Sequence, residues 1–378
     1  MKIKVIILIA IAFGIMACEN QENEFDDFGS TSVYFPFQTP VRTLIQGEYD
    51  LGFNENDNNG RFEIGVIMSG VYNNNKNRRV HFELAPELID PDKLGVDSVN
   101  VKILPASYYN IEQESPVTIP SGSTKGRIPV QLTDAFFDDP QSFAEFGEVH
   151  YVIPLRITDY EELDTLLAGV PVVDNPIKIR ESDWNPAPKD YTLFGIKFMN
   201  KYQGIYLRRG EDKVVGTSEK VTIATGETET TNIDTTTVYR EEFVVHDELT
   251  PISTAGKNKA ISTNLVRRGS IASNSTVSLE LTFDSNEEIT IVNADEDSDF
   301  NITGTGRFLE DGDEWGGEKR NVIYLEYEYQ DVEVVEEMRF GTVISRTTVD
   351  LMHTVKDTLV IRDRDVKFEE FIVELKEE

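Results

Sequence analysis

Cysteine is almost absent from this 378-residue sequence, because Cys18 is the only one. A single cysteine cannot form an intrachain disulfide, so stability must come from apolar cores. Tryptophan and histidine are also scarce, with two and four copies. The histidines are far apart, and none forms a close-spaced metal pair such as H-E-x-x-H. The sequence also has no G-x-S-x-G elbow, P-loop or dinucleotide fingerprint, so it carries none of these common catalytic and nucleotide-binding motifs.

Positive charge is in short supply. The sequence has 36 Lys and Arg against 68 Asp and Glu, a formal net charge of −32. Cleavage after Ala17 would remove Lys2 and Lys4, two positive charges, which would leave −34 on the mature chain. A chain this acidic repels nucleic acid and anionic lipid, so we expect neither as a partner.

Long hydrophobic runs are missing after the first seventeen residues. The apolar run Val5–Ala17 follows Lys2 and Lys4, which is the layout of a secretion signal, and it is shorter than the roughly 20 residues that span a bilayer. It ends in Ile15-Met16-Ala17-Cys18, which has the pattern of a bacterial lipobox. We therefore expect a signal peptide over residues 1–17 and lipidation of Cys18, with the mature chain lipid-anchored at the outer membrane.

Residues 18–30 are polar and acidic, with almost nothing to bury, and predict a flexible tether. The acidic stretch directly after Cys18 resembles the surface-export signal of Bacteroidetes lipoproteins. It favours display on the cell exterior. A solvated linker of incidental charge is the other interpretation, and the sequence does not separate exterior from periplasmic display.

The rest of the chain has the period of β-strands. Residues 31–175 contain short alternating or apolar runs between Asn, Gly, Pro and Asp clusters, which predicts an antiparallel β-sandwich. One short helix is expected at Glu161–Leu167, where three leucines share a face. A proline-rich connector near residues 175–190 then separates this part from a second β series.

The second series, residues 184–378, has long consecutive strands with short polar turns, which predicts a β-barrel or a strongly curled sheet. We assign Tyr191–Phe198 as its first strand and the Thr-rich segment Thr225–Thr237 as an exposed loop or hairpin. Asp295–Asp299 has alternating oxygen ligands but lacks the glycine and glutamate of a calcium loop, so an acidic turn is the better interpretation. No metal or other cofactor is expected.

Several segments together resemble a known family, the SusE/SusF-like two-domain surface lipoproteins encoded beside starch-utilisation-type transporters in Bacteroidetes. They run in the family's order along nearly the whole mature chain: Val33-Tyr34-Phe35, Ser107-Tyr108-Tyr109, Ile119-Pro120-Ser121-Gly122, Tyr151–Thr158, Pro188-Lys189-Asp190-Tyr191, Gly204–Gly210 and Ile361-Arg362-Asp363-Arg364. The resemblance implies an immunoglobulin-like N-terminal sandwich, a calycin-like C-terminal barrel and a role in holding glycan at the cell surface.

We therefore expect a non-catalytic lipoprotein that binds an oligosaccharide or polysaccharide and supports its uptake by a SusC/SusD-type outer-membrane transporter complex. A surface glycoside hydrolase is one alternative, since acidic residues are plentiful and a catalytic pair needs only two of them. A structural or adhesive lipoprotein is the other. It would present a donor-strand groove or a large apolar patch.

Glycan binding needs flat aromatic faces beside polar groups. Trp315 lies in a glycine-rich acidic loop and is either a stacking platform or a lid on the barrel end. Trp184, just before the second β series, is either a ligand contact or a plug at the domain interface. Tyr202, at a strand start, is the third candidate.

Overall fold

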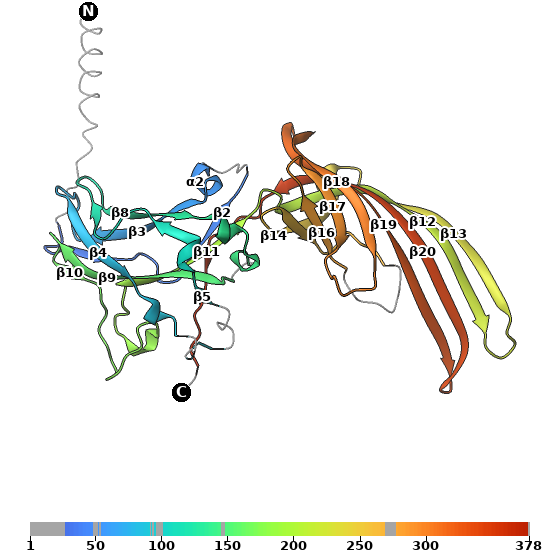
Figure 1. Cartoon of the computed structure of the whole chain (residues 1–378), viewed down its shortest axis with the longest axis horizontal. Helices are drawn as coiled ribbons and strands as arrows, with labels where there is room; N and C mark the ends of the chain where they lie inside the picture. The colour runs from blue at the N-terminus through green and yellow to red at the C-terminus, as the bar shows by residue number, and fades with distance from the viewer. Residues whose placement is uncertain are drawn as a thin grey trace, which may run out of the picture.

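The computed structural model describes residues 27–47, 52, 54–90, 92, 94, 95, 101–144, 148–268 and 277–376. The predicted signal peptide, Cys18 and most of the predicted tether lie outside these residues. The last tether residues already contact the first domain, because the Phe28 amide donates to the Gly70 carbonyl at 3.0 Å. The described chain folds into two β-bodies joined by a narrow junction (Figure 1). None of its helices is long and apolar enough to cross a membrane.

The first body is a sandwich of two sheets. One sheet has the order β10-β1-β3-β8-β6, and the other has the order β21-β2-β11-β9-β4-β7 with β5 beside β9. The strands are β1 (Ser32–Tyr34), β2 (Pro40–Ile45), β3 (Arg61–Ser69), β4 (Arg78–Leu84), β5 (Lys102–Ile103), β6 (Tyr109–Ile111), β7 (Val117–Ile119), β8 (Lys125–Leu132), β9 (Tyr151–Glu161), β10 (Thr165–Leu166), β11 (Tyr191–Met199) and β21 (Glu369–Glu370). Two short helices, α2 (Glu55–Asn58) and α3 (Asp134–Phe137), connect them.

Side-chain alternation explains the sandwich. In β3, Phe62, Ile64, Val66 and Met68 are buried and the residues between them are exposed or half-buried. These side chains join one apolar cluster with residues of both sheets, so the core lies between the two layers. The predicted all-β class and N-terminal sandwich are confirmed.

Two details differ from the sequence prediction. The segment expected to be a helix, Glu161–Leu167, instead contains the end of β9 and the strand β10, which pairs in parallel with β1. Its leucines Leu163 and Leu166 pack on the sandwich core. The spacing of the leucines therefore reflects packing on the sheets of the sandwich and not one face of a helix.

The second difference concerns β11, which we had assigned to the C-terminal series. It pairs antiparallel with β9 and parallel with β2, so it is a strand of the sandwich. β21, close to the C-terminus, pairs with the other edge of β2. Phe371 then packs against Val41, Tyr191 and neighbouring apolar residues. The sandwich is therefore built from both ends of the chain.

The second body is a nine-stranded sheet that closes on itself. Its strands are β12 (Gly204–Thr222), β13 (Thr228–Tyr239), β14 (Glu248–Gly256), β15 (Lys259–Ser262), β16 (Leu279–Phe283), β17 (Glu288–Asn293), β18 (Ile302–Trp315), β19 (Glu318–Arg339) and β20 (Thr342–Asp363). β12 pairs with β14 at its start and with β20 along its length, which closes a ring that leaves only β13 outside. This confirms the predicted barrel-like second body.

Glycines allow close strand contacts in this ring. A Cβ on Gly304 would approach the Glu326 carbonyl oxygen to 2.5 Å, and one on Gly306 would overlap the Tyr324 carbonyl oxygen. Only glycine permits β18 to lie so close to β19 at these points. An apolar cluster that includes Tyr206, Phe283, Phe308 and Leu359 fills the interior.

Four strands extend well beyond the ring and curve away from it (Figure 1). We call residues 211–239 and 330–353 the wing. Their pairings give the strand order β13-β12-β20-β19. The predicted hairpin at Thr225–Thr237 is confirmed as the β12–β13 hairpin. One wing face carries the exposed apolar side chains Val215, Val334 and Met352. On the other face, Asp212, Asp331 and His353 are buried near the ring.

Candidate functional site

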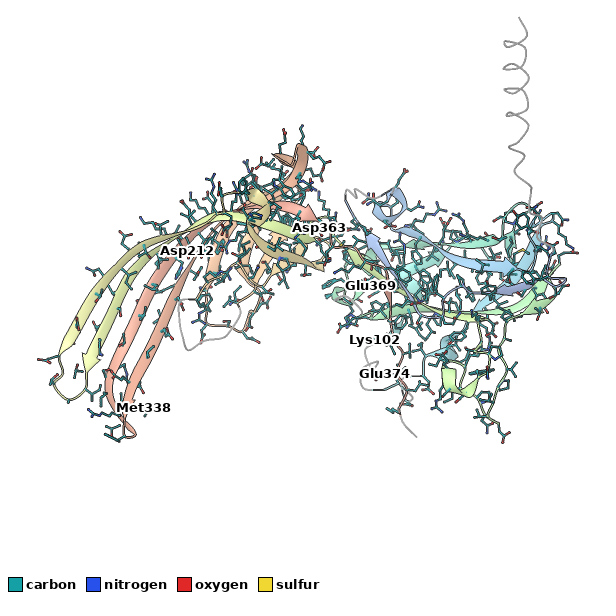
Figure 2. The ribbon with its side chains drawn as sticks, turned by 180° about the vertical axis from the view of Figure 1, so that it is seen from behind. Lys102, Asp212, Met338, Asp363, Glu369 and Glu374 are labelled. Atoms are coloured by element: carbon teal, nitrogen blue, oxygen red, sulfur yellow. The ribbon has the colours of Figure 1, made fainter. Side chains whose placement is uncertain are left out.

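A cavity with a volume of about 820 Å³ lies between the two bodies. Residues from both contribute to its walls. Figure 2 shows Glu369 at this junction, between Asp363 on the barrel side and Glu374 on the sandwich side. We call this cavity the interdomain cleft. The residues used below are Thr43, Phe143, Glu148, His150, Lys197, Phe198, Gln203, Ser253, Thr254, Lys367 and Glu369.

The floor of the cleft is a buried ion pair. Lys197 Nζ donates to Glu369 Oε2 at 2.8 Å, and both side chains are less than a tenth exposed. Thr43 Oγ1 donates to the other oxygen of Glu369 at 3.2 Å, and Lys197 also donates to the Glu148 carbonyl at 3.3 Å. Because β11 supplies Lys197 and β21 supplies Glu369, the floor exists only where the chain returns to the sandwich.

The sandwich wall of the cleft combines an apolar ring with an imidazole. Phe143 is half-buried and packs edge-on against the buried Phe198, with 6.1 Å between ring centroids. His150 is also half-buried, and its Nδ1 donates to the Gln141 carbonyl at 3.1 Å. Its Nε2 is therefore the ring nitrogen that remains for a ligand. An aromatic ring beside a hydrogen-bonding group suits the C–H and O–H surfaces of a sugar.

The barrel wall supplies amide and hydroxyl groups. Gln203 Oε1 accepts from the Thr254 amide at 2.9 Å and from Thr254 Oγ1 at 2.6 Å. This fixes the side chain of Gln203 and leaves its Nε2 as a donor toward the cleft. Ser253 is exposed on the same wall. The cleft can therefore offer oriented donors and acceptors from both bodies.

The three residues chosen from the sequence lie in three separate places. Trp315 is half-buried at the β18–β19 turn, with the Arg320 guanidinium 4.7 Å from its ring centroid. Trp184 donates from Nε1 to the Ile177 carbonyl at 2.9 Å, and Lys178 lies over its ring. Tyr202 is 3% exposed. The structure thus does not bring them together into one site.

Tyr202 instead holds the barrel interior together. Its ring stacks on Phe283 with 3.5 Å between centroids, and its hydroxyl donates to Glu287 Oε2 at 2.9 Å. Burial and the Glu287 carboxylate raise the pKa of Tyr202 far above its usual range. A ring covered in this way has no face for a sugar.

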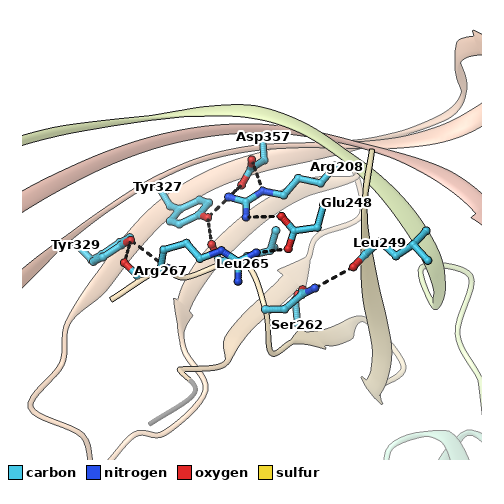
Figure 3. A network of polar contacts seen from close by, with 10 residues as sticks. Arg208, Glu248, Leu249, Ser262, Leu265, Arg267, Tyr327, Tyr329 and Asp357 are labelled. Carbon is cyan, nitrogen blue, oxygen red and sulfur yellow. Dashed lines mark hydrogen bonds and ion pairs between the residues drawn. The ribbon is translucent and has the colours of Figure 1, made fainter. Parts of the chain in front are cut away.

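A second polar cluster lies inside the barrel, where the wing begins (Figure 3). Arg208 donates to Asp357 through Nε at 2.8 Å and through Nη2 at 3.0 Å. The Tyr327 hydroxyl is 3.1 Å from Asp357 Oδ2 and 3.1 Å from the Leu265 carbonyl. Burial raises the pKa of Asp357, and the Arg208 charge opposes that shift.

This cluster bears on the hydrolase alternative. A general acid needs a raised pKa and must reach the substrate. Asp357 is the one described carboxyl group with a raised pKa, but its side chain has no exposed surface and its oxygens bind Arg208 and Tyr327. Among the described residues, no group of three His, Cys, Asp or Glu side chains could hold a metal ion. The described carboxyl group whose pKa burial raises is therefore out of reach of a substrate.

The cleft residues were not found from the sequence. Phe143, His150, Gln203 and Glu369 are spread over more than two hundred positions, and none belongs to a motif. They converge only because the C-terminal segment returns to β2. The sequence held one weak signal that the C-terminal segment returns to the sandwich. Phe371 is apolar and follows the last predicted barrel strand, so an isolated barrel would leave it without a packing partner.

Two family models match separate parts of the chain. Residues 201–365 match a domain of unknown function, DUF5627, and residues 26–164 match a model described as an N-terminal domain. The two matched ranges fall on the barrel and the sandwich respectively. No protein of curated function matches the sequence.

One solved structure shows the same architecture. A Bacteroides ovatus protein of unknown function is 29% identical and superposes with a TM-score of 0.72, over 90% of this chain and 97% of that one. An auxiliary nutrient binding protein from Bacteroides thetaiotaomicron is 14% identical over 84% of this chain and 91% of that one, with a TM-score of 0.35. That score is too low to support an argument about function. The first of these structures shows that the two-body architecture occurs in a Bacteroides protein.

Proposed function

We propose that this protein is a non-catalytic surface lipoprotein that binds an oligosaccharide or polysaccharide in the interdomain cleft. It supports uptake of that glycan by a SusC/SusD-type transporter complex of the outer membrane. The observation that carries the proposal is the cleft itself, which combines the Phe143 ring with fixed polar groups from both bodies.

The charge of the cleft favours a neutral glycan. Lys197 pairs with Glu369 at the floor, and Lys367 pairs with Asp365 at 2.8 Å. His150 and Gln203 are hydrogen-bonding groups on opposite walls. The large negative charge of the whole chain also disfavours a polyanionic glycan. Oriented donors without a strong local charge suit the hydroxyl groups of neutral hexoses.

Affinity gel electrophoresis of soluble protein starting at Glu19, with a panel of plant, host and microbial polysaccharides, tests the binding. We expect retardation by at least one neutral glycan and no released sugar. Phe143→Ala should abolish most of the retardation, because stacking on an aromatic ring contributes about 1 kcal/mol or more. Phe340→Ala, at the exposed wing tip, is the matched control and should bind normally.

Trp315→Ala tests whether the glycan binds instead at the β18–β19 turn, where the sequence analysis placed a candidate residue. Loss of binding in Trp315→Ala with normal binding in Phe143→Ala would move the site to the barrel end. Released sugar would instead support the hydrolase alternative, and no retardation by any glycan would contradict the binding role.

The anchor is tested separately in cells. Replacing Cys18 with Ala should move the protein from the membrane fraction to the soluble fraction, because the acyl chains are its proposed attachment. Protease added to intact cells should degrade the wild-type protein if it faces the exterior. Protection from protease would place it in the periplasm.

A further inference from the structure

The strand β13 forms the outer edge of the wing and pairs on one side only, with β12 (Figure 1). It is 12 residues long, and none of its side chains is buried. An edge strand of this length presents a row of backbone N–H and C=O groups that another strand can pair with.

The sequence of this edge is unprotected. Natural edge strands are usually interrupted by lysine, proline or a bulge, which discourages pairing. Between Thr228 and Tyr239 there is no lysine, arginine or proline, six residues are threonine, and the only charges are Glu229 and Asp234. The pairing of β13 with β12 runs in continuous register from Gly210 to Val221 without a bulge.

The opposite edge of the wing is different. Beyond Tyr329, β19 is no longer paired with β18, and the ten residues 330–339 include four carboxylates. Repeated like charges disfavour pairing of this edge with itself. Only the β13 edge therefore combines length, regularity and low charge.

We propose that β13 pairs edge to edge with β13 of a second copy of this chain. The two strands run antiparallel about a two-fold axis perpendicular to the sheet, with Ile233 opposite Ile233 of the second copy. The two wings then form one continuous sheet. This inference concerns the wing and does not depend on glycan binding in the cleft.

The charges of β13 are compatible with this register, and a threonine pair favours it. With Ile233 on the axis, Asp234 lies opposite Asn232 and Glu229 lies opposite Thr237, so no carboxylates oppose each other. Thr230 then faces Thr236, a pair that is favourable across antiparallel strands. A register centred on Asp234 would instead place two aspartates in direct opposition.

Edge pairing also keeps the acidic parts of the wings apart. The wing carries 11 Asp and Glu against 4 Lys and Arg, so two wings stacked face to face would repel. In the coplanar arrangement, β19 is three strand spacings, about 14 Å, from β13 of its own wing. This exceeds the Debye length of about 8 Å at physiological ionic strength, so the β19 carboxylates are largely screened. The dimer should strengthen as salt is added.

Cross-linking tests the contact directly. Protein starting at Glu19 contains no cysteine, so a single introduced cysteine reports one position. Ile233→Cys should form a disulfide-linked dimer under mild oxidation, because directly opposed Cβ atoms are about 5 Å apart. Thr225→Cys, exposed in the hairpin turn, is the control and should cross-link much less. Equal cross-linking of the two variants would overturn the proposal.

A charge pair at one position tests the register. Asn232→Lys places two lysines opposite the two Asp234 residues, whereas Asn232→Asp places two carboxylates there. Sedimentation equilibrium from about 10 µM to about 500 µM should show a weak wild-type dimer, because the edge buries little apolar area. We expect the dissociation constant to fall about three- to tenfold for Asn232→Lys and to rise by a similar factor for Asn232→Asp.

Both substitutions are at the same exposed position, so they perturb folding alike. Shifts in the same direction for the two variants would refute the register. A wild-type protein that stays monomeric over the whole concentration range would refute self-pairing. It would do so even if the β13 edge were found to bind a different protein.

Discussion

The Arg208–Asp357 pair gives the sharpest test of how the barrel is stabilised. Asp357→Ala would leave the Arg208 guanidinium with a fully buried side chain and no bidentate partner. The nearest remaining carboxylate, Glu248 Oε2, is 3.7 Å from Nη1. Breaking a buried ion pair from one side costs about 3–5 kcal/mol. With an m-value of about 2 kcal/mol/M, the urea midpoint of the barrel should fall by about 2 M.

The reciprocal change should behave differently with pH. Arg208→Met leaves Asp357 buried, and burial already raises its pKa. Without the arginine that pKa rises further above its unfolded value, so the folded variant binds a proton more tightly than the unfolded chain does. The deficit in its free energy of unfolding is therefore full above the folded pKa and shrinks as the pH falls through that pKa toward the unfolded one. Asp357→Ala should show no such relief, since arginine does not lose its proton.

Tryptophan fluorescence makes the measurement specific to one body. Trp184 lies in the segment before β11 and Trp315 at the end of β18, so Trp184→Phe leaves a reporter of the barrel alone. The double variant Arg208→Met with Asp357→Leu should recover most of the lost stability, because no charge remains unpaired. If each single variant lowers the free energy of unfolding of the barrel by less than about 1 kcal/mol at every pH, the pair is not desolvated and the argument is refuted.

Three further predictions follow from particular contacts. Phe371→Ala should destabilise the sandwich by about 3–5 kcal/mol in urea unfolding followed by Trp184, whereas Ile372→Ala, 80% exposed, should change it little. Burial raises the pKa of Tyr191 to about 12 from its ordinary 10.0. The stability that this shift provides is present below pH 10.0 and lost between pH 10.0 and about 12, and phenolate absorbance should show Tyr191 ionising only as the sandwich unfolds. Gly216→Val should overlap the Asp350 carbonyl oxygen and loosen the wing, which faster hydrogen exchange in β20 would reveal; unchanged exchange would contradict the close approach.

Much of the fold was predictable because half-buried strands alternate. The alternation of buried and more exposed side chains along β3 is what its sequence suggests, and the sandwich and barrel classes were both predicted correctly. The wing was harder to predict. β12 was read as two short strands, at its start and its end, because its middle, from Glu211 to Lys220, shows no apolar period in the sequence. The more buried side chains of this middle alternate with exposed ones, but only Val214 among them is a large hydrophobic residue.

The membership of β11 and β21 was not predictable for another reason. Their partners β9 and β2 lie far away in the sequence, and local pattern carries no information on which sheet a strand joins. The prediction of the binding residues was limited for the same reason. The candidates were chosen by residue type, as two tryptophans and a tyrosine. The cleft is instead built from Phe143, His150 and Gln203, which only the junction of the two bodies brings together.

The return of the C-terminal segment to β2 has a consequence for the order of folding. The barrel is contained in one continuous stretch, so it can fold as soon as β20 has been made. The sandwich lacks β21 and Phe371 until the last ten residues emerge, although its other strands come first. The part of the protein that is synthesised first is thus completed last, and a chain interrupted near its end would carry a finished barrel on an unfinished sandwich.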